Sequence, residues 1–333
     1  MKALIIADNN QLEFVDKEIP IPKDHEVLIK INAVALNHRD QFIREGKYPG
    51  ISVGTILGSD ASGTVLETGK NVDSVWKSKE VLINPNVNWG ENSKVQSSNY
   101  HILGTPSDGL FCEYVTIDAQ KIAEKPAHLS LENAAALPLG GMTAFRALFH
   151  HGRCQKGENI LISGVGGGVA QFAFQFALAK GANVYVTSSD ETKRTKSTEL
   201  GAKGAFNYKD SNWVKEAKSK SGGFDLAIDS AAGEGINDLI KLMNPAGRIV
   251  FYGATQGKTQ NLDVHRMFWN QITLQGSTMA NDDEFKEMLA YVRKNRIEPI
   301  IDSVRPFNEI ITAFDKMKAG DQFGKLVISL LSN

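Results

Sequence analysis

The sequence has very few cysteines and no long apolar run, and each absence excludes a class of protein. Among 333 residues only Cys112 and Cys154 are cysteines, so we expect neither a disulfide framework nor a thiolate metal site. No run of about 18 apolar residues occurs, which excludes a membrane-spanning helix, and the apolar stretch in the opening MKALIIADNN is too short for a signal peptide. These features indicate a soluble, cytoplasmic globular protein.

An excess of charge of one sign is also missing. The chain has 37 basic and 38 acidic residues, so we expect no nucleic-acid partner and favour a small-molecule substrate. The length is greater than most single cores and suits two domains.

Short apolar runs separated by Gly, Pro and Asn dominate residues 1–125 and predict mainly β structure. The polar stretch 84–109 has no such pattern and predicts a long loop. Residues 281–333 contain two amphipathic helical patterns, at 283–296 and 307–320, followed by a strand pattern at 324–331. We assign 1–125 and 281–333 together to one mainly β domain.

Residues 126–280 have a different order of predicted elements, in which strand and helix patterns alternate. A helical stretch at 129–152 has expected breaks at Pro138 and at the Gly140–Gly141 pair. Alternation of this kind predicts an α/β Rossmann domain, a doubly wound parallel sheet with helices on both faces. The six expected strands are 158–165, 183–189, 204–208, 224–231, 247–254 and 272–280.

Glycines are concentrated where the first of these strands meets a strongly apolar helical pattern. The spacing is Gly164-x-x-Gly167-x-x-Ala170. The free amides at a helix N-terminus attract anions, and glycine lets a pyrophosphate approach the backbone. We therefore predict backbone contacts to a dinucleotide from Gly164, Gly167, Gly168 and Val169; the alternative is a tight turn without a ligand.

The end of the second strand indicates which dinucleotide binds. NAD sites carry an acidic residue there, but this chain has Ser188, followed by Lys193 and Arg194. A hydroxyl and cations favour the 2′-phosphate of NADPH. Asp190 leaves an alternative open, because it either caps the next helix or reaches the ribose and favours NAD.

Several stretches of the chain resemble medium-chain dehydrogenases/reductases, and within them the zinc-free quinone oxidoreductase branch. The resemblance implies a mainly β, GroES-like catalytic domain beside the Rossmann domain. Its carriers are VALNHRDQFIREGKYP (34–49), ILGSDASGTV (56–65), DGLFCEYV (108–115), AAALPLGGMTAFRAL (134–148), ELGAKGAFNYKD (199–210), FDLAIDSAAG (224–233) and FGKLVI (323–328).

Zinc members of this superfamily bind the metal through two Cys and one His. At the matching positions this chain has Asn37, Ser59 and Leu139, and 84–109 lacks the cysteines of a structural zinc site. We therefore expect no metal, with a new site built from His38, Asp40 and Asp60 as the alternative. Without a Lewis acid, quinones and α,β-unsaturated carbonyls are the acceptors that take hydride readily.

The remaining candidate residues follow from the resemblance and from strand ends. The resemblance places Thr143 near the nicotinamide, Tyr208 against the adenosine ribose, and Asn37 and Lys325 at the cofactor. Ser230 and Gly253 are further candidates for cofactor contacts, because they end strands at the carboxyl edge of the sheet, where a dinucleotide crosses. The candidates to orient a carbonyl or relay a proton are Tyr48, His38 and Asp60, each with a structural role as the alternative.

Together these features predict an NADPH-dependent reductase of quinones or activated carbonyls that works without zinc. Two alternatives stay open: a zinc alcohol dehydrogenase with an unusual site, and a non-catalytic, crystallin-like NADPH-binding protein. The strand at 272–280 would be an exposed sheet edge in a monomer, so we also expect a homodimer.

Overall fold

The computed structural model describes residues 1–331, which form two compact units. The first unit combines Met1–Gly140 with Asn281–Asn333, and the second is Gly141–Ala280. Within residues 1–331 no helix has both the length and the apolar composition needed to cross a bilayer. The sequence places the first domain boundary near residue 126, whereas the structure keeps residues 126–140 with the first unit.

Helix α2 (Leu131–Ala135) accounts for this difference in the boundary. Its Ala135 lies in a buried cluster with Ala33 of one strand and Val327 of another, both in the first unit. Side chains this small let the helix approach the sheet closely, and the apolar area that is buried stabilises the contact. Sequence periodicity marks the helix but does not show which core it joins.

A seven-stranded sheet forms the centre of the first unit, in the order β16-β17-β3-β4-β5-β9 with β8 paired to β3. In β3 (Glu26–Ala35), Val27, Ile29 and Ile31 alternate along the strand and enter one apolar core. The predicted mainly β domain is therefore confirmed. The other strands of this sheet are β4 (Asp60–Thr68), β5 (Glu80–Ile83), β8 (Tyr114–Asp118), β9 (Ile122–Glu124), β16 (Ile301–Pro306) and β17 (Lys325–Ser329).

Shorter elements complete the first unit. The predicted loop 84–109 contains a small antiparallel pair, β6 and β7. Strand β16 is missing from the sequence prediction, because its sequence IDSVRP has few apolar residues and no regular alternation of apolar and polar ones. The further elements are β1 (Lys2–Ile6), β2 (Leu12–Asp16), α1 (His38–Arg44), β6 (Asn86–Val87), β7 (His101–Ile102), α9 (Asp282–Asn295) and α10 (Ile310–Ala319), with 3₁₀ turns at Asp8–Asn10, Ser74–Trp76, Ala119–Lys121 and Phe307–Glu309.

The second unit is built on a six-stranded parallel sheet in the order β12-β11-β10-β13-β14-β15. Numbered within the unit, this order is 3-2-1-4-5-6, the doubly wound arrangement that the sequence predicts. The strands are β10 (Asn159–Ile162), β11 (Asn183–Thr187), β12 (Gly204–Phe206), β13 (Phe224–Asp229), β14 (Met243–Phe251) and β15 (Thr273–Gly276).

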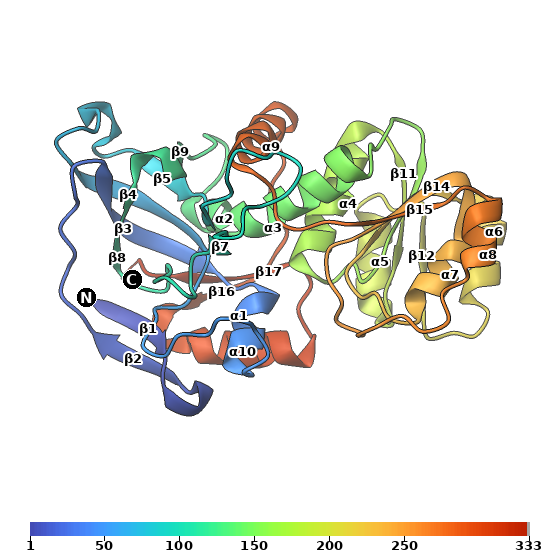
Figure 1. Ribbon diagram of the computed structural model, residues 1–333, viewed down its shortest axis with the longest axis horizontal. Helices are drawn as coiled ribbons and strands as arrows, with labels where there is room; N and C mark the ends of the chain where they lie inside the picture. The colour runs from blue at the N-terminus through green and yellow to red at the C-terminus, as the bar shows by residue number, and fades with distance from the viewer. Residues whose placement is uncertain (332–333) are drawn as a thin grey trace. The chain divides into compact units, whose positions relative to one another are not determined.

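Helices cover both faces of this parallel sheet (Figure 1). On one face α4 buries Phe172, Phe174 and Phe176 almost completely. On the other, α6 and α7 share an apolar cluster with β10 and β13. The helices of the unit are α4 (Gly168–Lys180), α5 (Glu191–Glu199), α6 (Trp213–Ser221), α7 (Gly235–Leu242) and α8 (Val264–Trp269), with a π-helical turn at Arg146–His151.

Helix α3 (Pro138–Phe145) corrects one detail of the sequence prediction. The expected break at Gly140–Gly141 does not occur, and the helix runs through both glycines. Pro138 is the first residue of the helix, where proline loses no hydrogen bond. Each glycine costs about 1 kcal/mol in a helix, and burial of all eight residues of α3 offsets this cost.

Candidate active site

The glycine-rich turn of the second unit joins β10 to α4. Gly164 has φ +61°, a conformation that favours glycine. The N-cap of α4 is Gly167, and no side chain caps the helix there. The amides of Gly168 and Val169 fall in the first helical turn, where the helix itself supplies no acceptor. The turn therefore presents backbone donors and the positive end of the helix dipole.

Protein atoms do not close this turn. A Cβ added to Gly164 would lie 3.4 Å from the Ser230 Oγ, and one added to Gly167 would lie 3.6 Å from the Gly164 oxygen. Both are ordinary contacts. Gly253 is different, since its Cβ would lie 2.7 Å from the Ser230 oxygen, so only glycine fits there. The predicted residues Gly164, Ser230 and Gly253 thus lie at neighbouring strand ends, and their contact with a dinucleotide stays a prediction.

Asp190 lies just after the end of β11, and the sequence leaves open whether it caps the next helix or reaches a ribose. In the structure the Asp190 Oδ1 accepts the Lys193 backbone N–H at 2.8 Å, so this carboxylate caps α5. Arg194 donates from Nη1 to the Ser188 carbonyl at 2.8 Å. The Tyr208 hydroxyl donates to the Ser189 Oγ at 3.3 Å. A hydroxyl, two cationic residues and an exposed phenol therefore gather around this strand end.

Thr143, the residue that the resemblance places near the nicotinamide, is buried in α3. Its hydroxyl donates to the Sδ of Met279 at 3.5 Å. The structure thus fixes the hydroxyl within the second unit, and its role toward a cofactor stays a prediction.

A buried polar cluster lies in the first unit at the start of α1. The Lys325 ammonium donates to the Asn37 Oδ1 at 2.7 Å and to the Asp60 Oδ2 at 2.9 Å. Asp60 also accepts from the Asn37 Nδ2 at 2.9 Å and from the Leu139 backbone N–H at 2.7 Å. Because a buried charge is tolerated only when it is paired and hydrogen-bonded, these three side chains form one interdependent unit.

Arg39 and Asp40 belong to the same region, although the sequence does not single out Arg39. Both are buried, and Arg39 Nη1 lies 3.8 Å from Asp40 Oδ1. Burial raises the pKa of Asp40 to about 6, against the opposing effects of Arg39 and of the Asn37 N–H. The signal in the sequence is the charged pair Arg39–Asp40 of NHRD, which begins two residues after Asn37, a place where a buried helix start needs neutralising partners.

The three candidate catalytic residues have different surroundings. His38 is exposed, yet the protein atoms around its ring lower its pKa, and the Lys325 charge adds to the effect. Tyr48 is half-buried and its hydroxyl lies 3.4 Å from the Arg39 Nε. Asp60 is fully buried, and its oxygens accept the hydrogen bonds described above. The geometry therefore favours His38 and Tyr48 as groups that can meet a substrate, whereas Asp60 is engaged in the buried cluster, and the catalytic role of all three stays a prediction.

The positions where the resemblance places zinc ligands do not fit a zinc ion. Asn37 accepts a hydrogen bond from an ammonium, the Ser59 hydroxyl donates to the Leu103 carbonyl at 2.9 Å, and Leu139 is apolar. Catalytic zinc needs thiolate, imidazole or carboxylate donors at tetrahedral positions. In the described part of the chain, no three His, Cys, Asp or Glu side chains are grouped to hold a metal, which also argues against the alternative site of His38, Asp40 and Asp60.

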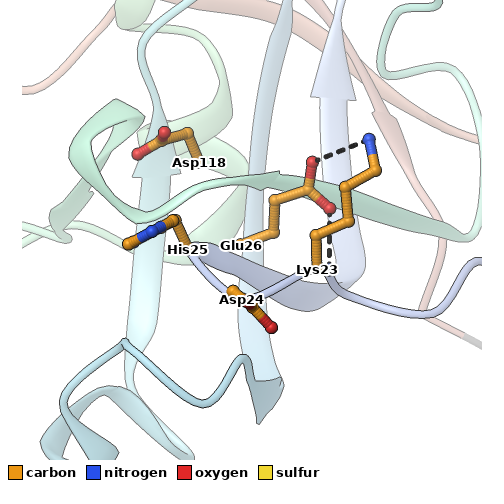
Figure 2. A pocket seen from close by; sticks show the side chains of 5 residues that line it. All are labelled: Lys23, Asp24, His25, Glu26 and Asp118. Atoms are coloured by element: carbon orange, nitrogen blue, oxygen red, sulfur yellow. Dashed lines mark hydrogen bonds and ion pairs between the residues drawn. The ribbon is translucent and has the colours of Figure 1, made fainter.

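An open depression on the first unit offers no second candidate. Figure 2 shows the five side chains that line it, all of them polar: Lys23, Asp24, His25, Glu26 and Asp118. They are engaged locally: Lys23 pairs with Glu26, Asp24 pairs with a neighbouring lysine, and Asp118 caps a 3₁₀ turn. None of these partners belongs to the cluster around Asp60.

Comparisons with known proteins agree with both units. Residues 23–127 match the family described as alcohol dehydrogenase GroES-like domain, and residues 168–294 match the family described as zinc-binding dehydrogenase. The chain is 34% identical over 340 residues to the zinc-type alcohol dehydrogenase-like protein YogA of Leptosphaeria maculans, covering 96% of this chain and 94% of the relative.

Two further matches point the same way. The quinone oxidoreductase of Mus musculus is 27% identical over 327 residues, covering 95% of this chain and 92% of that protein. A solved structure described as an NAD-dependent alcohol dehydrogenase has a TM-score of 0.93 at 30% identity, covering 99% of this chain and all of that one. With both family matches and the fold in agreement, this chain belongs to the medium-chain dehydrogenase/reductase superfamily.

Proposed function

We propose that this protein is an NADPH-dependent reductase that delivers hydride to a quinone or an α,β-unsaturated carbonyl without a catalytic zinc ion. The observation that carries the proposal is the buried cluster of Asn37, Asp60 and Lys325. At a position where zinc relatives have a metal ligand, this chain has an amide that accepts from an ammonium. The similarity to a quinone oxidoreductase supports the same assignment.

The chemistry follows from the missing Lewis acid. A plain ketone needs its oxygen polarised strongly before it accepts hydride, and zinc supplies that polarisation in metal-dependent enzymes. Quinones and enones spread the incoming charge over a conjugated system, so positioning and hydrogen bonding suffice. Bound NADPH would supply the hydride, and the protein would supply orientation, a dry environment and a proton.

Residues of the second unit fit such a cofactor. The amides of Gly168 and Val169 suit a pyrophosphate, and Ser188, Lys193 and Arg194 suit a 2′-phosphate. Asp190, which would favour NAD if it reached the ribose, is committed to capping α5. These contacts support NADPH over NADH in this chain, although the neighbouring solved structure is described as NAD-dependent.

The direct test is turnover with purified protein. We expect NADPH oxidation with a simple quinone or an enone, little oxidation with a saturated ketone, and no loss of rate in the presence of a zinc chelator. Elemental analysis of the same sample should find no stoichiometric zinc. Zinc at one equivalent together with chelator-sensitive alcohol oxidation would instead establish a metal-dependent alcohol dehydrogenase, and NADPH binding without turnover on any acceptor would establish a non-catalytic protein.

A homodimer is the assembly that we propose, with a second copy pairing at the β15 edge. Strand β15 ends the six-stranded sheet, and α8 directly before it exposes Phe268 by 64% and Trp269 by 79%. An unpaired edge beside large apolar side chains is a surface that proteins usually cover. Strand pairing across a two-fold axis would cover both at once.

We expect the wild-type protein to sediment as a dimer at micromolar concentration, and the double variant F268D/W269D to sediment as a monomer. Burying two carboxylates in the interface should weaken it by several kcal/mol. The far-ultraviolet circular dichroism should stay unchanged, because both side chains are exposed in the single chain. A wild-type monomer, or a variant that still dimerises, would show that this edge is not the interface.

A further inference from the structure

Arg39 is a buried cation whose head group is held firmly in the first unit. It is 8% exposed, and it lies in the first turn of α1. Its Nη1 donates to the Ser59 Oγ at 2.5 Å and to the Leu103 carbonyl at 2.8 Å. Among the described residues, its Nη2 has no hydrogen-bond partner. A buried guanidinium is costly to maintain, so its placement calls for a reason beyond packing.

The guanidinium lies against the ring of Tyr48. Its central carbon is 4.8 Å from the ring centroid, and its Nε donates to the Tyr48 hydroxyl at 3.4 Å. Because the phenolic oxygen accepts from Arg39, the hydroxyl hydrogen is directed elsewhere. Tyr48 is half-buried whereas Arg39 is buried, so the phenol is the part of this pair that a substrate can reach.

This arrangement suits the loss of a proton from Tyr48. A phenolate next to a fixed guanidinium would accept a stronger hydrogen bond than the neutral phenol does, because both partners then carry charge. A preorganised donor that is aimed at a developing negative charge stabilises it without reorganisation. The carboxylate that pairs with Arg39 is that of Asp40, whose Oδ1 lies 3.8 Å from the Arg39 Nη1. At this distance the guanidinium can still interact with a second anion.

We propose that Arg39 is a positioning residue that holds the Tyr48 hydroxyl and stabilises its phenolate, so that Tyr48 is the proton donor of the reduction. The inference depends on the proposed reductase function. Hydride supplied by bound cofactor would form a C–H bond on an enone or an O–H bond on a quinone, and the Tyr48 O–H bond breaks as its proton passes to the resulting enolate or hydroquinone anion. Water then returns a proton to Tyr48.

A second phenol nearby provides a matched control. Tyr100 is close enough for Tyr48 and Arg39 to influence it, but its hydroxyl donates to the Asn86 Oδ1 at 2.7 Å. Burial also raises the pKa of Tyr100 above its usual range. Tyr100 is therefore a poor proton donor, and its replacement by phenylalanine should leave turnover almost unchanged.

The test is a double-mutant cycle on kcat. We expect Tyr48→Phe to lower kcat about 100-fold, as loss of a general acid does, and Tyr100→Phe to change it less than about twofold. Arg39→Gln keeps a hydrogen-bond donor but removes the charge, and we expect it to lower kcat about 10-fold. In the Tyr48→Phe background the same Arg39 change should cause no further loss, because the phenolate that it stabilises is gone.

Other results would overturn the inference. If Arg39→Gln lowers kcat by the same factor with and without the Tyr48 hydroxyl, Arg39 acts only on the structure. If Tyr48→Phe retains kcat while His38→Gln loses it, His38 is the donor. The NADPH dissociation constant and the melting temperature of each variant check folding, and Arg39→Lys replaces the Gln variant if the latter does not fold. Failure of the wild type to reduce any acceptor would instead refute the proposed function itself.

Discussion

Replacing Gly167 with aspartate is expected to make the protein more heat-stable and, at the same time, to prevent it from binding NADPH. Gly167 is the N-cap of α4, and its φ of −78° and ψ of 149° suit any residue. An added Cβ would meet only an ordinary contact, at 3.6 Å. Aspartate at an N-cap accepts the free amides of the first turn and interacts well with the helix dipole. The helix therefore gains the cap that it lacks in the wild type.

The gain should be about 0.5–1 kcal/mol, which for a protein of this size raises Tm by about 1–3 °C. The same carboxylate would occupy the amides that a pyrophosphate needs and would repel its charge, so affinity should fall at least about 100-fold. Thermal melts of the apoprotein and a fluorescence titration with NADPH measure the two effects. Opposite signs for stability and binding would be hard to explain by misfolding.

Gly167→Ala is the matched control, because it adds the Cβ without the charge or the cap. We expect this variant to bind NADPH within about 10-fold of the wild type. Its Tm should change little, because alanine is a poorer N-cap than glycine but also lowers the entropy of the unfolded chain. If Gly167→Asp binds NADPH as well as the wild type does, the N-terminus of α4 is not the pyrophosphate site, and the proposed function loses its cofactor.

The second large effect concerns the choice between NADPH and NADH. We expect the double variant K193A/R194A to raise KM for NADPH about 100-fold and to leave KM for NADH nearly unchanged. Each charge-assisted hydrogen bond to a phosphate contributes about 1.5–3 kcal/mol, and NADH lacks the phosphate that these cations would bind. Steady-state kinetics with both cofactors and one acceptor measure the change.

Lys196→Ala provides the comparison from the same helix. Lys196 is exposed on α5 and lies farther along the helix than the Asp190 cap, so its removal tests the effect of one lost charge on the surface. We expect it to change either KM by less than about twofold. A wild-type preference for NADH, or equal losses with both cofactors in the double variant, would refute the 2′-phosphate assignment.

Much of the second unit is predictable from sequence because its interactions are local. A strand, a glycine-rich turn and an apolar helix follow one another between Asn159 and Lys180, so the order of residues itself encodes the geometry of the turn. The parallel sheet follows from the alternation of elements and from the right-handed crossover rule. Asp190 is a case in which sequence leaves two roles open, and the contact with the Lys193 N–H decides between them.

The candidate site of the first unit is different, because its parts are distant in the chain. Lys325 and Asn37 are 288 residues apart, and Arg39 reaches the Leu103 carbonyl across 64 residues. Sequence names Asn37, Tyr48, Asp60 and Lys325 only through the resemblance. It does not show that they divide into a buried ion cluster and a separate arginine–tyrosine pair.

The sequence by itself determined the two folds, the glycine-rich turn before α4 and the absence of the inherited zinc ligands, since each depends on residue type, spacing or local periodicity. The tertiary structure alone decided that α2 belongs to the first unit, that α3 continues through two glycines, and that Arg39 lies against Tyr48. The physical reason is burial: whether a glycine breaks a helix, and whether a charge is tolerated, depends on neighbours that folding brings from elsewhere in the chain.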